Sequence, residues 1–445
     1  MKKNLLSLAL LMFVGYLSTA QEVEFEEFDL DNGLHVILHQ DNSAPIISAG
    51  FMVDAGGKDL GGNNNPERTG FAHFYEHLLA SGPTKNIEKG TWRKIRAARG
   101  GNGNATTSLD RTFYYQTFPS NNLELALWMD SERLLHPIVD QDAVDTQNEV
   151  VKEEKRLRYD NSAYGQILFA INENLFTKHP YKNKNIGEME HLDAATLKEF
   201  QDYFKKWYVP SNMVYVLAGD FDTDEAKKMI KEYFSAIPKG DKPVRNFPKE
   251  SPITKTRKAK FYDSNIQLPA IVAAYRTPPQ IERDNYVLTM ISSYLSAGKS
   301  SVLYKKMVDQ QKQALAVQAV NLSQVDGGIY ALFALPLGDV TLKNLLAEMD
   351  EEIVKLQTEL ISERDYQKLQ NQFENQFVNS NSSIQGIASS LVTNYLLYGD
   401  TNLINTQIDI YRSITREDIQ SVAKKYLNPN QRVEIEYLPK NDSND

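Results

Sequence analysis

The sequence has 445 residues, of which 41% are hydrophobic and 24% charged, a composition typical of a globular protein of two or three domains. The formal charge is -9 at pH 7 and no block of lysine or arginine stands out, which argues against a nucleic-acid-binding protein. The chain has no cysteine, so disulfides and thiolate zinc sites are excluded, and histidine and carboxylate remain as the strong zinc ligands.

Residues 1–20 have the pattern of a secretory signal peptide. Two lysines are followed by an apolar stretch over Leu5–Leu17 and by the small residues Ser18, Thr19 and Ala20. The apolar stretch is too short for a permanent membrane span, and the absence of cysteine excludes a lipid attached to one. We therefore expect a mature chain that begins near Gln21 and has no stable membrane anchor. The alternative is an N-terminal anchor that stays attached.

Strands and a loop are predicted before the first informative helix. Phe25–Gln40 alternates around Asn32-Gly33, a hairpin turn signal, and Pro45–Val53 is the next predicted strand. A loop rich in glycine and asparagine, Gly61–Pro66, leads into the segment that begins at Phe71.

The segment Phe71–Leu79 carries His73, Glu76 and His77 in the order H-x-x-E-H. On a helix the two histidines share one face with Glu76 beside them, while the rest of the segment is apolar and predicted to be buried. Two imidazoles can bind zinc, and the carboxylate is then placed to take a proton from a zinc-bound water. The alternative is a set of hydrogen-bonded core residues.

A glycine-rich stretch after this helix is predicted to form two strands within Gly101–Phe118. Small residues at Gly103 and Ala105 allow another backbone to approach, so an edge strand here could pair with an extended peptide. Composition alone favours the alternative, an ordinary hairpin.

The helix predicted over Asp142–Asp160 contains a second group of interest. Glu154 and Gln147 fall in the middle of an apolar face defined by Val144, Val150, Val151 and Leu157. A carboxylate in such a face is costly unless it is paired or bound to metal, so Glu154 is the natural third zinc ligand. Three protein ligands leave one position for water, as in catalytic zinc sites. The alternative for Glu154 is a buried salt bridge to an arginine.

The second half of the chain repeats features of the first. The helix, turn and strand over Leu197–Leu217 are echoed over Ile419–Tyr437, and a Pro- and Lys-rich segment separates the halves. We expect an α+β fold of two homologous domains, each a mostly antiparallel sheet with helices packed on one face. The expected bounds are 21–240 for the zinc domain, 241–258 for the linker and 259–438 for a second domain without the zinc motif, followed by a disordered tail over 439–445.

These motifs resemble the pitrilysin-type zinc metallopeptidases, a family that includes mitochondrial processing peptidase and bacterial periplasmic peptidases. The resemblance is carried by Thr69–His77, by Val150–Glu154 and by Gly100-Gly101 with Asn104-Ala105. It implies zinc at His73, His77 and Glu154, with Glu76 as the general base. It also implies an edge strand at Asn104 and Ala105 that holds the substrate backbone, and a periplasmic location.

Two departures from the family pattern are visible. Gln147 stands where the family usually has a glutamate that supports the ligands, which predicts weaker metal binding or water activation. An Arg and a Tyr that grip the substrate in many members are replaced by apolar residues, Val302 within Ser301–Leu303 and Val317 within Ala314–Val317. We therefore expect a dimer, formed with a homologous chain that supplies the Arg and Tyr.

The sequence predicts a zinc endopeptidase that cleaves unfolded peptides in a closed chamber. A second hypothesis is a non-catalytic or weakly active subunit of a peptidase heterodimer. A third, an unrelated metal-binding protein, is disfavoured by the family-like first half.

Overall fold

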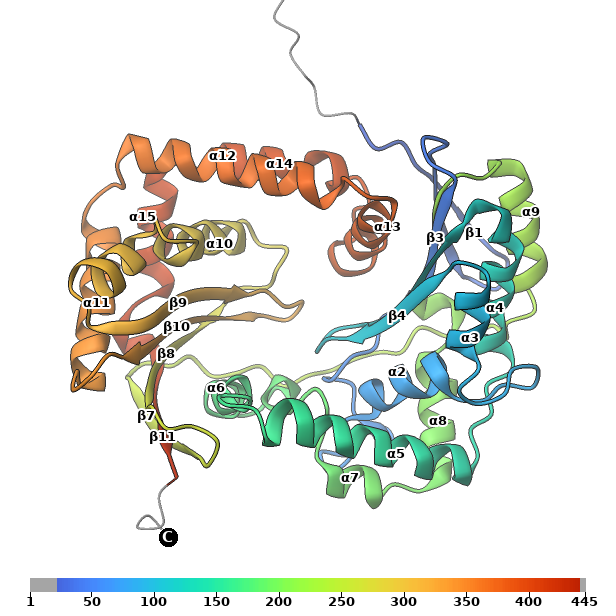
Figure 1. Ribbon diagram of the computed structural model, residues 1–445, viewed down its shortest axis with the longest axis horizontal. Coiled ribbons are helices and arrows are strands. Elements are labelled where there is room, and N and C mark those ends of the chain that lie inside the picture. The colour runs from blue at the N-terminus through green and yellow to red at the C-terminus, as the bar shows by residue number, and fades with distance from the viewer. Residues whose placement is uncertain (1–21, 441–445) are drawn as a thin grey trace, which may run out of the picture.

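A computed structural model describes residues 22–440, so the predicted signal peptide and residues 441–445 of the predicted tail lie outside the described residues. The described chain forms two halves, each built on one sheet, and one edge of each sheet is directed toward the middle of the molecule (Figure 1).

The first sheet has six strands in the order β1-β2-β6-β3-β5-β4. β1 and β2 form the hairpin predicted from Asn32-Gly33, and Gly33 has a φ of 91°, which favours glycine. β2 and β6 are parallel, and the other neighbours are antiparallel. The strands are β1 (Glu26–Asp29), β2 (His35–Gln40), β3 (Ile46–Val53), β4 (Asn102–Thr107), β5 (Thr112–Pro119) and β6 (Met213–Gly219).

The second sheet repeats five of these strands in the order β7-β11-β8-β10-β9. β7 and β11 are parallel and the other neighbours are antiparallel, so the pattern matches β2-β6-β3-β5-β4 strand for strand. The predicted repeat and the α+β fold are therefore confirmed, and β4 and β9 are the equivalent outer strands. The strands are β7 (Arg257–Asp263), β8 (Ala270–Thr277), β9 (Ala314–Leu322), β10 (Gly328–Pro336) and β11 (Arg432–Pro439).

The helices belong to the two halves in chain order. Those of the first half are α1 (Gly61–Asn64), α2 (Phe71–Ser81), α3 (Trp92–Ala98), α4 (Leu123–Leu135), α5 (Gln141–Lys155), α6 (Ile167–Leu175), α7 (Met189–Asp193), α8 (Leu197–Trp207) and α9 (Thr223–Phe234). Those of the second half are α10 (Arg283–Ser296), α11 (Leu342–Thr358), α12 (Glu363–Ser380), α13 (Ile384–Thr393), α14 (Leu403–Ser413) and α15 (Arg416–Tyr426). π-helical turns continue α5 as η2 (Arg156–Asp160), follow α10 as η5 (Tyr304–Gln310) and follow α13 as η6 (Asn394–Tyr398).

The echoed helices α8 and α15 begin in the same way. Thr196 caps α8 in a capping box with Glu199, and Thr415 caps α15 in a capping box with Asp418. Both boxes satisfy amides that a helix start would otherwise leave without partners. The repeat therefore extends to the local chemistry that starts each helix.

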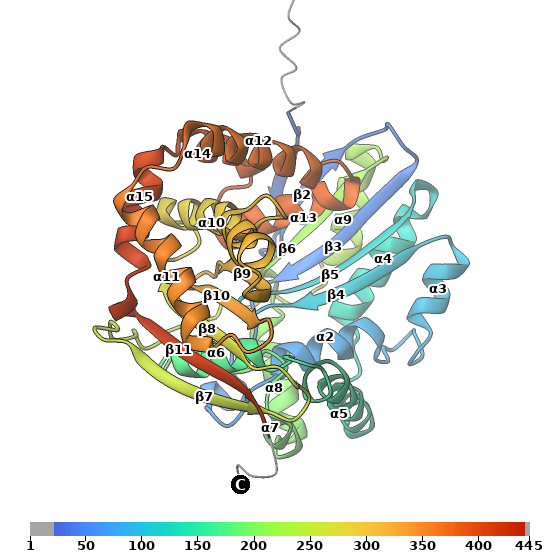
Figure 2. The same cartoon turned by 60° about the vertical axis from the view of Figure 1, so that its left-hand side comes forward.

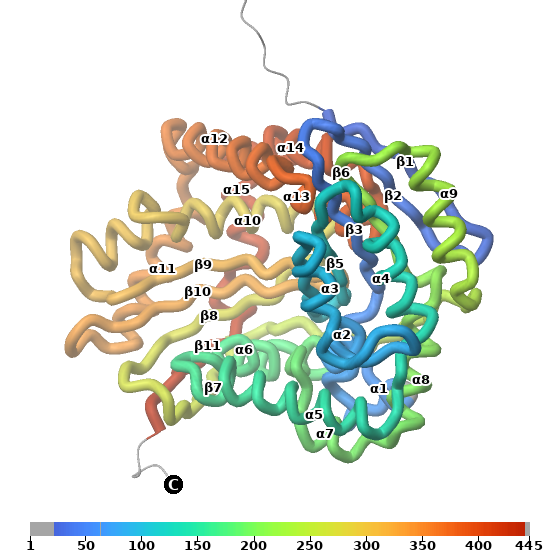
Figure 3. The backbone as a smooth tube through the Cα atoms, turned by 45° about the vertical axis from the view of Figure 1, so that its right-hand side comes forward, coloured from blue at the N-terminus to red at the C-terminus, as the bar shows by residue number. Residues whose placement is uncertain are grey.

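Each sheet is covered on its second face by a helix from the opposite half. The first sheet is covered by helices of its own half and also by α13 of the second half, whose Ile387 and Leu391 pack on it. Figure 2 shows α13 beside β2 and β6. In the same way α6 places Ile171 and Leu175 under the second sheet (Figure 3). Because apolar surface is exchanged between the halves, neither half buries its sheet alone.

The segment predicted as a linker is extended but tied down. Arg245 donates to Asp59 Oδ1 at 2.6 Å, and Glu250 accepts hydrogen bonds from the amides of Thr177, Lys178 and His179. β7 begins at Arg257, one residue before the expected linker end at 258, and β11 runs through Pro439, the first residue of the expected tail. No helix within residues 22–440 is long and apolar enough to cross a membrane.

Candidate metal centre

Helix α2 carries the two histidines on its one polar side. Its apolar residues pack in the core of the first half, with exposures of 2% or less for Phe71, Phe74, Tyr75, Leu78 and Leu79, as the sequence predicted. The Tyr75 hydroxyl donates to the carbonyl of Phe200 on α8, which fixes the roll of α2 about its axis. The rings of His73 and His77 lie 4.7 Å apart, centroid to centroid, and project from the remaining face.

Helix α5 packs against α2 and brings Glu154 to the histidines. Glu154 Oε2 lies 2.8 Å from His77 Nε2 and 3.6 Å from His73 Nε2. One ligand atom from each of the three residues lies within 4.8 Å of the others. The structure thus brings together all three side chains that the sequence selected as metal ligands.

The arrangement fits a zinc ion. Zinc–ligand bonds of about 2.0–2.1 Å at tetrahedral angles separate ligand atoms by about 3.3 Å, and the two measured separations from Glu154 Oε2 lie on either side of that value. His77 Nε2 and Glu154 Oε2 are buried 2.8 Å from each other, and neither has a hydrogen-bond partner outside this group among the described residues. Buried polar atoms without partners are costly, and a shared cation would satisfy both.

Arg158 holds the second oxygen of Glu154. Its guanidinium lies 2.7 Å from Glu154 Oε1, one turn further along at η2. The imidazoles of His73 and His77 outweigh burial and hold the pKa of Glu154 well below its ordinary value. The carboxylate is therefore ionised, as a metal ligand must be. The alternative for Glu154 was a buried salt bridge to an arginine; the pair that exists uses Oε1, and its arginine is 71% exposed.

Two residues of the face predicted to be apolar and buried are exposed. Val144 and Val151 are buried, whereas Val150 is 43% exposed and Leu157 is 61% exposed. The helical wheel places Glu154 between these side chains, but periodicity predicts only the face of α5 on which a residue lies. Whether that face is buried depends on elements elsewhere in the chain, and here α2 covers only part of it.

The charge of Glu76 acts on a half-buried arginine, Arg111, and on a tyrosine, Tyr159, neither of which was predicted from the sequence. Arg111 donates to the carbonyl of Thr106 at 2.7 Å. Burial lowers the pKa of Arg111, and the nearby Glu76 partly opposes this. Burial raises the pKa of Tyr159, as do the charges of Glu154 and Glu76. The only sequence signal for Arg111 is its place at the end of the predicted hairpin.

Gln147 is 4% exposed, on the α5 face predicted for it. Its Oε1 has no hydrogen-bond partner among the described residues, and neither does Nδ1 of His73. Gln147 is thus buried without charge where the resemblance implied a glutamate.

Strand β4 presents a free edge near the centre. At the turn, the N–H of Ser108 donates to the carbonyl of Arg111 on the β5 side. In an antiparallel pair, every second residue directs its N–H and C=O to the partner strand, so those of Asn104 face β5 and those of Ala105 face outward. Asn185 Nδ2 already donates to the carbonyl of Thr107, one outward position further on. An extended peptide would therefore find the N–H and C=O of Ala105, rather than those of Asn104.

Comparison with known proteins identifies the family. Residues 35–187 match the family model described as "Insulinase (Peptidase family M16)", and residues 194–373 match "Peptidase M16 inactive domain". The chain belongs to peptidase family M16.

Curated M16 relatives match nearly the whole chain. The zinc protease PqqE of Helicobacter pylori is 26% identical over 439 residues, which are 98% of both chains. A probable mitochondrial-processing peptidase subunit beta of Arabidopsis thaliana is 22% identical and covers 89% of this chain and 75% of its own. This M16 chain thus has relatives that are named as zinc proteases.

Solved structures show the same fold at two lengths. A protease from Helicobacter pylori has a TM-score of 0.88 at 25% identity and covers 94% of this chain and 100% of its own. Pitrilysin has a TM-score of 0.76 at 17% identity, and this chain covers 46% of it. The periplasmic protease PqqL of Escherichia coli is matched over 47% of its length with a TM-score of 0.73 at 18% identity. The last two contain about twice the length of the present fold.

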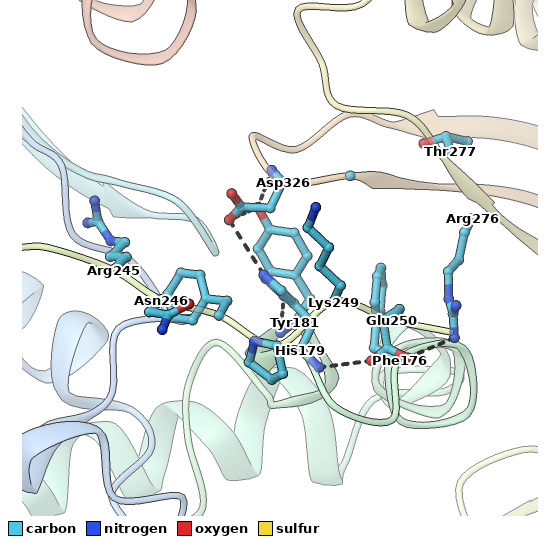
Figure 4. Close-up of a pocket in the computed structure, with 13 residues that line it drawn as sticks. Phe176, His179, Tyr181, Arg245, Asn246, Lys249, Glu250, Arg276, Thr277 and Asp326 are labelled. Atoms are coloured by element: carbon cyan, nitrogen blue, oxygen red, sulfur yellow. Dashed lines mark hydrogen bonds and ion pairs between the residues drawn. The ribbon is translucent and has the colours of Figure 1, made fainter. Parts of the chain in front are cut away.

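Val302 and Val317, which stand where many family members have the substrate-binding Arg and Tyr, differ in burial in the second half of this M16 chain. Val317 is buried in the core of that half, and Val302 is half-buried just before η5. Neither side chain can hydrogen-bond a substrate. A cavity of about 540 Å³, lined by the linker and by residues of both halves, contains none of the predicted site residues in its lining (Figure 4).

Proposed function

We propose that this chain is a zinc-dependent endopeptidase that hydrolyses peptide bonds in unfolded peptides. The observation that carries the proposal is the convergence of His73, His77 and Glu154 from α2 and α5, with Glu76 on the same helix as the histidines. Membership of peptidase family M16 and relatives named zinc proteases support it.

His73, His77 and Glu154 would hold the zinc ion, which when bound lowers the pKa of a coordinated water and polarises a peptide carbonyl. Glu76 takes the proton of the attacking water and delivers it to the leaving amine. Arg158 keeps Glu154 oriented by holding its other oxygen.

The peptide would lie extended along β4 and pair with the outward main-chain groups at Ala105, while Asn104 contributes its side chain. Binding through main chain gives loose side-chain specificity. An enclosed chamber would admit unfolded peptides and exclude folded proteins.

Replacement of the general base tests this proposal. Glu76→Gln should retain about one zinc ion per chain and lose about 10²- to 10⁴-fold in kcat, because the ligands remain and the proton acceptor is gone. The matched control is Glu153→Gln, a neighbour of Glu154 that is paired with Arg156 and should keep both zinc and activity. Unchanged hydrolysis by Glu76→Gln would refute the mechanism.

A second candidate function is a non-catalytic or weakly active subunit. The buried, uncharged Gln147 and the valines at 302 and 317 favour it. Zinc analysis together with a fluorogenic peptide assay separates the two, since an inactive subunit would fail to cleave whether or not it binds zinc.

The assembly we propose is a periplasmic dimer, formed with a homologous chain that supplies the missing Arg and Tyr. Its support is that pitrilysin and PqqL contain about twice this length of fold. Purification from the source organism should yield a heterodimer, and a homodimer with full activity would contradict the proposed partner.

A further inference from the structure

Two turns from opposite halves meet at one buried lysine. The β4–β5 turn presents Asp110, and the equivalent β9–β10 turn presents Asp326. Lys58 Nζ lies 2.8 Å from Asp110 Oδ1 and 2.7 Å from Asp326 Oδ2. Only 3% of the Lys58 side chain and 6% of that of Asp110 are exposed, so solvent screens this pair little, whereas the Asp326 side chain is 35% exposed.

Further hydrogen bonds join the two turns, one directly and others through Tyr181. The Tyr181 hydroxyl donates to Asp110, and the backbone N–H of Asp326 donates to the Tyr181 hydroxyl at 3.0 Å. The N–H of Val325 donates to Asp110 Oδ2 at 3.1 Å. Figure 4 shows Asp326 above Tyr181 and His179 at this junction.

Lys58 is the charge that makes this junction possible. Burial alone would lower the pKa of Lys58. The carboxylates of Asp110 and Asp326 more than offset this effect and raise the pKa, so the ammonium stays charged. Without it, the buried carboxylate of Asp110 would face that of Asp326 with no ammonium between them, which is unfavourable.

The same junction fixes the end of β4. The N–H groups of Gly57 and Lys58 donate to the carbonyls of Ser108 and Leu109 at 2.9 and 3.0 Å. A shift of Asp110 relative to Asp326 would therefore move the turn from which β4 extends. The orientation of the free edge depends on contacts with the second half.

We propose that Lys58 is a positioning residue for peptide hydrolysis: by joining Asp110 to Asp326 it fixes the free edge of β4 relative to the second half. This inference rests on the proposed function, because the position of β4 affects catalysis only if a peptide lies along it. Lys58 contacts neither the ligands nor the peptide and acts through the turn.

The first test measures geometry and needs no activity. Because the chain has no cysteine, labels can be attached to cysteines introduced at two exposed positions, Lys94 on α3 and Lys299 in the second half. Pulsed spin-label spectroscopy on the full chain should show a shifted or broadened distance distribution in Lys58→Met and in Asp326→Asn. Lys198→Met removes an exposed lysine paired with Asp202 and should change nothing. An unchanged distribution in both junction variants would overturn the proposal.

The second test separates positioning from stability. Asp326→Asn, which keeps the pair of Lys58 and Asp110, should bind zinc normally and lose about 10- to 100-fold in kcat/KM, mainly through KM, as expected for a misplaced binding edge. The double variant Lys58→Met/Asp326→Asn also lacks one of the two facing carboxylates. It should therefore be more stable to urea than Lys58→Met, but its KM should stay as high as that of the single variants. Recovery of KM together with stability would show a merely structural role. If the wild-type chain cleaves no peptide, the proposed function fails, and the label distances still decide whether the junction sets the geometry.

Discussion

Arg158 lies 2.7 Å from Oε1 of Glu154, so that only Oε2 faces the two histidines. The contact is local, between residues four apart, and it leaves Oε2 of this α5 carboxylate for the histidines of α2. Arg158 is 71% exposed, which limits its contribution because solvent screens the pair.

Loss of Arg158 should weaken metal binding modestly. We expect Arg158→Gln to raise the zinc Kd about 3- to 10-fold, the low end for partners of metal ligands because of its exposure. The measurement is competition with a zinc chelator at low salt, and the difference should shrink in 1 M NaCl. Arg156→Gln, which breaks only the neighbouring pair with Glu153, is the control, and an equal effect of both changes would refute the assignment.

A carboxylate at position 147 should strengthen the metal site at the expense of the metal-free protein. We expect Gln147→Glu to lower the zinc Kd about tenfold, because added negative charge behind the ligands favours the cation. The metal-free variant should unfold at a lower temperature, since the new charge is buried. Calorimetry with and without zinc measures both effects. The control is Asn148→Asp, another buried amide on α5, and tighter binding by that variant would show a general charge effect.

Glu250 should make stability depend on pH in the acid range. Burial would raise its pKa, but the amides of Lys178, His179 and Thr177 lower it to about 2, from an ordinary value of 4.5. A depressed pKa stabilises the folded state above pH 4.5, and this contribution is lost as the pH falls from 4.5 toward 2. Urea unfolding of Glu250→Gln should show a loss of about 1–2 kcal/mol at pH 7 and only about a quarter of that near pH 2.5.

The matched control for Glu250 is Glu149→Gln, whose carboxylate is 75% exposed and paired with Lys152. Its loss should be within about 0.5 kcal/mol at both pH values. A Glu250→Gln deficit that is equal at pH 7 and pH 2.5 would show that shape, rather than charge, accounts for it.

Helix α13 should couple the stability of the two halves. Leu391 is fully buried against the first sheet, although it belongs to the second half, and Leu391→Ala should cost about 2–5 kcal/mol. Because α13 and α6 each cover the opposite sheet, the variant should still unfold in one transition by circular dichroism and tyrosine fluorescence. Val378→Ala, at a position 55% exposed on α12, should cost little. Separate transitions for the two halves would contradict the coupling.

Features set by local spacing could be predicted from the sequence. The three and four residue intervals among His73, Glu76 and His77 place them on one side of a helix, whatever the rest of the chain does. The alternation around Asn32-Gly33 and the echo of Leu197–Leu217 likewise gave the first hairpin and the repeated fold. Glu154 was selected because a carboxylate in an apolar face needs a partner, and the family resemblance agreed.

The tertiary structure alone decided which surfaces meet. It leaves Val150 and Leu157 exposed and packs α6 and α13 each on the sheet of the opposite half. It also brings Asp110 and Asp326 together at the buried Lys58. The physical reason is that periodicity fixes the direction of a side chain relative to its own helix or strand, whereas burial and pairing depend on residues hundreds of positions away. The sequence by itself determined the candidate ligands and their helices, and only the packed chain determined how those helices are held.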